Sequence, residues 1–173
     1  MNITIFNFFF SLSSNNFIAG SSMFLSYSLI YFLIIFAIFM PIFIRRDFIY
    51  GALTFFTVCS TWVSVYVIKH IFMVERPFLT LKLTPLFLET GFSFPSSHTA
   101  IMAALTVVMW KLNRKLGIVF AIFTLLVGVS RMVIGVHYPF DVLAGACFGV
   151  LLGLGILWFF KVTHQFAFLK KYI

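Results

Sequence analysis

The sequence predicts an all-helical, polytopic transmembrane bundle with five spans, or six if the N-terminal segment also crosses. Of its 173 residues, 62% are hydrophobic and only 9% are charged, a balance typical of membrane proteins rather than soluble domains. Five stretches nearly free of charge are candidate spans: 23–44, 48–68, 91–110, 116–130 and 142–160. No second domain is indicated, so residues 1–173 are treated as one membrane domain.

Residues 1–20 carry many apolar side chains but no basic start, which argues against a cleaved signal peptide. We expect this N-terminal segment to lie at the membrane interface. A sixth, partial helix packed on the bundle is the alternative, and the sequence does not decide between the two.

Three of the stretches, 23–44, 48–68 and 142–160, have the length of a membrane span. A helix rises about 1.5 Å per residue, so roughly 20 apolar residues cross a hydrocarbon core of about 30 Å. They are therefore predicted to cross without help from polar residues.

The stretches 91–110 and 116–130 reach the length of a membrane span only if polar residues are included in them. The first contains three serines, Pro95 and His98 in its first half, and the second reaches full length only if it continues past Arg131. Polar and ionisable residues within a span are costly and usually serve a function. We therefore expect chemistry at these two ends.

The basic residues are unevenly divided between the two sides of such a bundle. One side carries Arg45, Arg46, Lys111, Arg114, Lys115, Lys161, Lys170 and Lys171, and the other carries Lys69, Arg76, Lys82 and Arg131. By the positive-inside rule the first side is cytoplasmic, as in a bacterial inner membrane. The polar segment 69–98 is then predicted to face away from the cytoplasm. Because the basic residues are scattered among spans, the net charge of +8 does not indicate nucleic-acid binding.

The connections differ in length. The turns at 45–47 and 111–115 are short, so the spans that they join are predicted to be antiparallel neighbours. The connection 71–97 is long, holds three prolines and keeps many apolar residues. We expect this connection to lie on the membrane surface, because it is rich in apolar residues. We also expect it to cover the active site, since long ordered connections often serve as lids.

The last span repeats small residues at Gly145, Gly149 and Gly153, which places them on one helix face. Such a face favours close packing. Contact within the bundle is the preferred interpretation, and a dimer seam, hence a homo-oligomer, is the alternative.

Three polar segments stand in order along the chain: KHIFMVERP at 69–77, FPSSH at 94–98 and SRMVIGVHYPFD at 130–141. Together they closely resemble the three-part signature of the type 2 phosphatidic acid phosphatase superfamily, which is Lys-x6-Arg-Pro, Pro-Ser-Gly-His and Ser-Arg-x5-His-x3-Asp. All spacings match. One position departs, since Ser97 stands where the family usually has glycine, a residue that lets a backbone amide approach a phosphate closely.

The resemblance implies a role for each catalytic candidate. His137 is the expected nucleophile, which holds the phosphoryl group covalently. Asp141 lies four residues further on and could reach back to the other ring nitrogen and fix the tautomer. His98 is the expected general acid, protonating the leaving oxygen and then activating water.

The resemblance also implies a phosphate-binding cage. Lys69, Arg76 and Arg131 are expected to bind the phosphoryl oxygens, the arginines through guanidinium forks. Ser96, and Ser97 with the amides nearby, are expected to complete the cage at a helix N-terminus. Only four acidic residues occur, whereas a two-metal phosphatase needs several carboxylates, so no metal and no cofactor are predicted.

Within the superfamily, the short chain, its opening and the run Glu75-Arg76-Pro77 are most similar to bacterial undecaprenyl-diphosphate phosphatases of the bacitracin-resistance type. This resemblance implies a polyprenyl diphosphate substrate and carrier recycling for peptidoglycan synthesis. Phosphatidylglycerol phosphate, phosphatidic acid and lipid A phosphate are alternative substrates. A small membrane transporter is the alternative from another class, disfavoured because the charges cluster at span ends rather than at the midplane.

Overall fold

The structure, a computed structural model, describes residues 2–169, so Lys170 and Lys171 lie outside the described residues. Within this range every regular element is helical, as predicted. The elements in chain order are α1 (Asn2–Ser11), η1 (Leu12–Ser14), α2 (Asn16–Met23), η2 (Phe24–Leu29), α3 (Ile30–Arg45), α4 (Phe48–Phe72), α5 (Pro77–Thr80), α6 (Ser97–Leu112), α7 (Arg114–Val133) and α8 (Pro139–Leu169).

Four helical segments of the described chain are long and apolar enough to cross a membrane. They are Asn16–Phe43, Phe48–Thr80, Arg114–Val133 and Pro139–Val162. The predicted span at 91–110 corresponds to α6, which is apolar but has only 16 residues because it begins at Ser97. Four candidate spans are therefore present, and a count of five or six remains a prediction.

The first span begins earlier than the hydropathy indicates, at Asn16 rather than at residue 23. The cause is a local cap: the side chain of Asn15 accepts hydrogen bonds from the backbone N–H groups of Phe17 (3.0 Å) and Ile18 (3.3 Å). α2 then continues through the π-helical segment η2 into α3.

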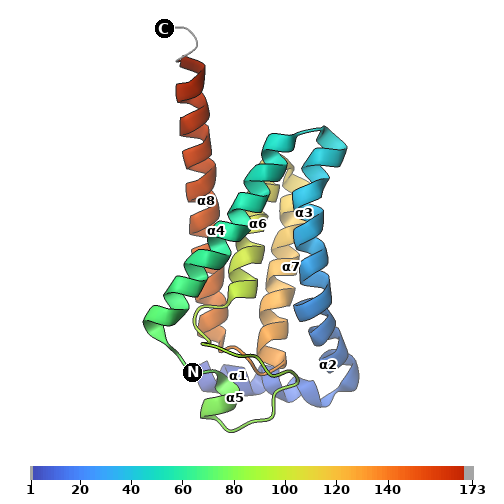
Figure 1. Cartoon of the computed structure of the whole chain (residues 1–173). Coiled ribbons are helices and arrows are strands. Elements are labelled where there is room, and N and C mark those ends of the chain that lie inside the picture. Colours follow the sequence, from blue (N-terminus) through green and yellow to red (C-terminus); the bar gives the residue numbers. More distant parts are fainter. Residues whose placement is uncertain (1, 170–173) are drawn as a thin grey trace.

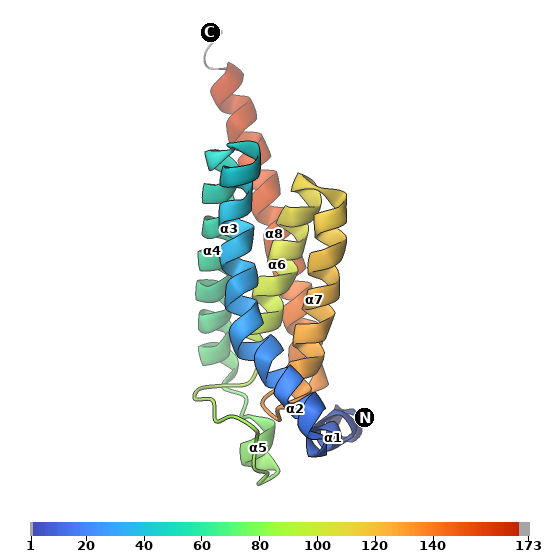
Figure 2. The same cartoon turned by 90° about the vertical axis from the view of Figure 1, so that its right-hand side faces the viewer.

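Helix α6 lies at the centre of the bundle, between α3, α4, α7 and α8 (Figures 1 and 2). Its buried side chains include Met102, Leu105, Val108 and Met109, which pack in one core with residues of α3 and α7. Since α6 is enclosed by other helices, its polar first turn is held inside the protein rather than in lipid.

The two ends of the bundle differ. The short turns from α3 to α4 and from α6 to α7 lie at the end from which α8 projects, whereas α1, α5 and the long connection cover the opposite end (Figure 1). Lys69, Arg76 and Arg131 belong to this covered end. The basic turns thus share one end, as the sequence predicted.

The glycine face of α8 packs within the bundle. A Cβ atom added to Gly145 would lie 2.6 Å from the carbonyl oxygen of Ser96, and one added to Gly149 would lie 2.1 Å from that of Ala100. At Gly153 the nearest atom is the carbonyl oxygen of Ala104, at 3.1 Å. All three glycines let α8 approach the backbone of α6, which confirms the bundle-contact interpretation.

Substituting Gly149 with alanine should therefore destabilise the protein by about 1–3 kcal/mol, because the clash is with backbone that cannot rotate away. Thermal unfolding in detergent measures this. Gly155→Ala is the matched control on the same helix, because no atom lies within 4 Å of its added Cβ. Equal stability of the two variants would contradict close α6–α8 packing.

The connection between α4 and α6 changes direction at its start. α4 ends at Phe72, and Met73 adopts a left-handed conformation with φ 46°. Arg76 is extended (φ −75°, ψ 151°) because the following proline, Pro77, excludes helical geometry there. Lys69 and Arg76 therefore do not share a helix, and the turn instead folds Arg76 back over the end of the bundle.

Helix α1 lies across the covered end of the bundle and contacts α7 and α8 (Figure 2). Phe6 is fully buried and its ring lies 5.5 Å from that of Tyr138. The side chain of Asn2 accepts a hydrogen bond of 3.2 Å from the backbone N–H of Phe140 at the start of α8. The N-terminal segment thus supports the turn between α7 and α8.

Candidate active site

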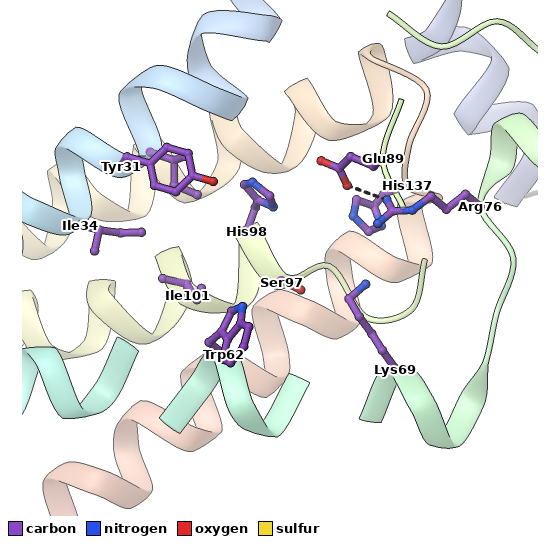
Figure 3. Close-up of a pocket in the computed structure, with 11 residues that line it drawn as sticks. Tyr31, Ile34, Trp62, Lys69, Arg76, Glu89, Ser97, His98, Ile101 and His137 are labelled. Atoms are coloured by element: carbon purple, nitrogen blue, oxygen red, sulfur yellow. Dashed lines mark ion pairs between the residues drawn. The ribbon is translucent and has the colours of Figure 1, made fainter. Parts of the chain in front are cut away.

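Polar side chains from five parts of the chain converge on one cavity of about 240 Å³ at the covered end of the bundle (Figure 3). The charged and polar lining residues are Lys69, Arg76, Glu89, Ser97, His98 and His137. The other lining residues are Ile30, Tyr31, Ile34, Trp62 and Ile101. Figure 3 shows the charged groups at one side, the apolar groups at the other, and His98 between them. A cavity of this kind suits a molecule with a charged head and an apolar body.

His137 stands in the turn between α7 and α8. The turn is fixed by a hydrogen bond of 3.2 Å from the backbone N–H of Val136 to the carbonyl of Arg131. Gly135 adopts φ +87°, a left-handed conformation that favours glycine, and an added Cβ would also lie 2.8 Å from the ring of Phe10. The backbone of this turn therefore holds the imidazole at the cavity wall.

Asp141 lies in the first turn of α8 and approaches His137 as the spacing predicted. Its Oδ2 is 3.6 Å from His137 Nδ1, an ion-pair distance rather than a direct hydrogen bond. The hydroxyl of Ser93 lies between them, donating to Asp141 Oδ2 and standing 3.3 Å from His137 Nδ1. The Nδ1 side of the ring is thus occupied, which leaves Nε2 for chemistry in the cavity.

Helix α6 begins at the cavity. The Oγ of Ser96 caps it, accepting a hydrogen bond of 3.5 Å from the backbone N–H of Thr99, so this side chain serves the helix and is buried away from the cavity. Ser97 and His98 follow in the first turn and line the cavity. Their N–H groups lack helical acceptors, so the helix start favours an anion.

Ser97, which stands where the family usually has glycine, has an ordinary backbone conformation. It is the first residue of α6 and is not among the residues with positive φ. Its backbone therefore needs none of the conformational freedom of glycine.

Lys69 and Arg76 hold the connecting segment to the site. The ammonium of Lys69 donates to the carbonyls of Phe92 (2.6 Å) and Ser93 (3.0 Å). The guanidinium of Arg76 donates to the carbonyls of Thr90, Gly91 and Val136, at 3.0 to 3.2 Å. Both cations therefore line the cavity and also organise the backbone around it.

Arg131 is fully buried in the last turn of α7, behind the lining residues. Its Nη2 forms an ion pair with Glu89, and its guanidinium lies 5.5 Å from the ring centre of Tyr27. Nε and Nη1 have no hydrogen-bond partner among the described residues. A buried guanidinium with two free donors is suited to bind a further anion.

Glu89, on the connecting segment, bridges the two arginines. One carboxylate oxygen is 2.8 Å from Arg76 Nη1, and the other pairs with Arg131 and accepts a hydrogen bond of 2.8 Å from the hydroxyl of Tyr27. Burial alone would raise the pKa of Glu89, but the two guanidinium groups outweigh burial and lower the pKa to about 2. The carboxylate is therefore charged at neutral pH.

The environment of His137 favours its neutral form. Burial lowers the pKa of His137 well below its usual range, and the cations Arg131 and Lys69 lower it further. A neutral imidazole has the lone pair that a nucleophile needs. This protonation state fits attack from Nε2.

Of the eight residues predicted from the sequence, five line the cavity: Lys69, Arg76, Ser97, His98 and His137. Asp141 and Arg131 lie directly behind them through the contacts described above. Ser96 caps α6. Sequence reasoning missed Glu89, Ser93 and Tyr27, because no motif marks them. The only signal was that Glu89 is one of four acidic residues and lies in the polar connection.

In the described part of the chain, no three His, Cys, Asp or Glu side chains gather as metal ligands would. The carboxylates of the site are instead paired with arginine or with the histidine. Metal independence remains a prediction that an assay with chelator tests.

A family model described as PAP2 superfamily matches residues 48–165. Undecaprenyl-diphosphatase BcrC of Bacillus subtilis (strain 168) is 34% identical over 103 residues, which is 59% of this chain and 53% of the relative. A protein named Bacitracin transport permease protein BcrC, from Bacillus licheniformis, is 38% identical over 85 residues, 48% of this chain and 42% of the relative. The chain thus spans about half the length of these relatives.

Two solved structures share the fold. The crystal structure of a transmembrane PAP2-type phosphatidylglycerolphosphate phosphatase from Bacillus subtilis has a TM-score of 0.68 at 26% identity, covering 84% of this chain and 76% of that one. LpxE from Aquifex aeolicus also has a TM-score of 0.68, at 24% identity, covering 90% of this chain and 94% of that one. With the four long apolar helices, these likenesses identify an integral membrane protein.

Proposed function

The chain belongs to the PAP2 superfamily, and on this premise we propose that it is a membrane phosphatase that removes the terminal phosphate from a lipid phosphate or diphosphate. The observation that carries the proposal is the convergence of Lys69, Arg76, His98 and His137 on one cavity. The cavity has an apolar side formed by α3, α4 and α6, where Tyr31 and Trp62 are 58% and 56% exposed. A lipid chain can leave the cavity along this side while its phosphate meets the cations.

In the first step, the lone pair of His137 Nε2 attacks phosphorus. The nitrogen–phosphorus bond forms while the bond from phosphorus to the leaving oxygen breaks, and that oxygen takes its proton from His98. Lys69, Arg76 and Arg131 stabilise the charge on the phosphoryl oxygens, together with the start of α6. Asp141, with Ser93, holds the Nδ1 side of the nucleophile.

In the second step, water attacks the phosphohistidine. His98, which has lost its proton, accepts one from the water as the nitrogen–phosphorus bond breaks. The products are inorganic phosphate and the dephosphorylated lipid, and both histidines return to their starting protonation states. Since the residues supply nucleophile, acid and cation cage, no metal is required.

The preferred substrate is undecaprenyl diphosphate, with undecaprenyl phosphate as the lipid product. The run Glu75-Arg76-Pro77 and the likeness to Undecaprenyl-diphosphatase BcrC support this choice. Phosphatidylglycerol phosphate, phosphatidic acid and lipid A phosphate are the alternatives, since relatives named Phosphatidylglycerophosphatase B and Lipid A 1-phosphatase are also similar. A transporter is disfavoured, because the charged residues of the site lie in the last turns of α4 and α7 and on the connection between α4 and α6, not in the middle of a span.

Phosphate release by the purified protein in detergent, with chelator present, is the test. We expect undecaprenyl diphosphate to be hydrolysed at least about tenfold more efficiently than the glycerolipid phosphates, a difference of about 1.4 kcal/mol in transition-state binding. Preference for a glycerolipid phosphate would contradict undecaprenyl diphosphate as the substrate but would leave the two-step mechanism unchanged. Activity that vanished in chelator and returned with a divalent cation would contradict the metal-free mechanism.

The cavity is proposed to face the extracytoplasmic side, because the turns rich in basic residues lie at the opposite end. Single cysteines at Thr84 and Lys115, which are exposed at the two ends, report the orientation. An impermeant thiol reagent added to intact cells should label the Thr84→Cys variant, with the parent protein, which holds Cys59 and Cys147, as background. Preferential labelling of Lys115→Cys would reverse the orientation.

A further inference from the structure

Glu89 occupies the position between the two guanidinium groups that are suited to bind phosphoryl oxygens. Its oxygens meet Arg76 at 2.8 Å and the buried Arg131, and its side chain is only 15% exposed. It also lines the same cavity as His98 and His137. The carboxylate thus presents to the arginines the same pair of anionic oxygens that a phosphate would present.

A phosphate and the Glu89 carboxylate cannot share this position at low energy. Both are anions, and like charges a few ångströms apart repel strongly where water is excluded. In the site without phosphate the arginines lower the pKa of Glu89 to about 2, so the carboxylate is charged when phosphate arrives. Binding of phosphate between the arginines therefore requires the carboxylate to move.

The segment around Glu89 is built so that this movement can be local. Residues 81–96 contain no helix, and Leu88 and Phe87, the residues just before Glu89, are exposed. Gly91 follows with φ +76° and no atom within 4 Å of an added Cβ. Among the described residues, the side chain of Glu89 makes one hydrogen bond besides its ion pairs, the one from Tyr27, whereas the neighbouring carbonyls of Thr90 and Gly91 are held by Arg76.

We propose that Glu89 is a built-in competitor for the phosphate cage, a carboxylate that must be displaced by the substrate phosphate and that returns to expel inorganic phosphate after each turnover. This inference rests on the proposed function. A lipid can displace Glu89 because contacts along its chain contribute binding energy, whereas free phosphate has only the cage. Glu89 thereby weakens binding of any phosphate to the cage, and inorganic phosphate, which lacks contacts along a lipid chain, is then held too weakly to stay after turnover.

The test measures binding of inorganic phosphate to the purified full-length protein by calorimetry. Glu89→Gln should bind phosphate at least tenfold more tightly than wild type, because the amide keeps the size and removes the competing charge. Glu75→Gln is the matched control, since Glu75 lies on the same connection but is exposed and does not line the cavity. It should bind phosphate as wild type does. Equal or weaker binding by Glu89→Gln would overturn the inference.

A second measurement uses the unmodified protein, in case Glu89→Gln does not fold. Hydrogen exchange of backbone amides in residues 86–92 should become faster as phosphate is added, because the carboxylate leaves its partners. Unchanged or slower exchange with phosphate bound would overturn the inference.

Lipid hydrolysis, assayed in parallel, separates the two proposals. Tighter phosphate binding by Glu89→Gln without hydrolysis of any lipid phosphate by the wild type would support the competitor and contradict the proposed function. If the wild type hydrolyses a lipid phosphate but Glu89→Gln binds inorganic phosphate no more tightly, the proposed function is supported and the competitor role of Glu89 is contradicted.

Discussion

Replacing His137 with alanine should lower phosphate release by roughly 10⁴- to 10⁶-fold, the largest effect expected of any single substitution here. The imidazole is fixed by the Gly135 turn, its Nδ1 side is occupied by Ser93 and Asp141, and burial keeps it neutral. Alanine removes the one atom, Nε2, that can bond to phosphorus. The cation cage remains, so binding of substrate should change far less than kcat.

The same experiment distinguishes a nucleophile from a residue that only supports the fold. Wild-type protein that is quenched in acid-free conditions during turnover of ³²P-labelled substrate should carry label on His137, and the alanine variant should carry none. His70→Ala is the control, because His70 lies at the same end of the bundle yet is exposed and does not line the cavity. Activity in His137→Ala within tenfold of wild type would rule out the covalent mechanism.

The fold could be predicted where hydropathy and helix signals agree. The glycines of α8 and the short turns of the chain indicated helix contacts that the structure confirms. Boundaries were less predictable, because local hydrogen bonds set them: Asn15 starts the first span early, and Ser96 delays the start of α6. Hydropathy averages over a window and does not register such caps.

The site could be predicted as far as the three polar segments reach. Lys69, Arg76, His98 and His137 come together because each segment ends a helix, begins a helix or lies in a turn at the same end of the bundle. Glu89 and Ser93 could not be placed, since they lie on an irregular connection whose path depends on carbonyls held by Lys69 and Arg76. Tyr27 reaches the site only through packing of the first span against that connection.

Replacing Arg131 with lysine should lower kcat/KM by about 10²- to 10³-fold, the loss typical of removing one well-placed donor to a developing charge. Lysine keeps the positive charge but not the planar fork. The buried guanidinium pairs with Glu89 through Nη2 and has Nε and Nη1 free for an anion. The single ammonium group of lysine can either pair with Glu89 or donate to the bound anion, but it cannot do both at once.

Arg114→Lys is the control for this substitution, because Arg114 lies at the far end of the bundle over Trp110. Its kcat/KM should stay within about twofold of wild type, as expected for an exposed residue far from the site. Thermal unfolding of both variants separates lost catalysis from lost folding. If Arg131→Lys kept more than a third of the wild-type kcat/KM while remaining folded, the fork would have no role in catalysis. Arg131 would then serve mainly as the buried partner of Glu89, and Lys69 and Arg76 would have to hold the phosphoryl group by themselves.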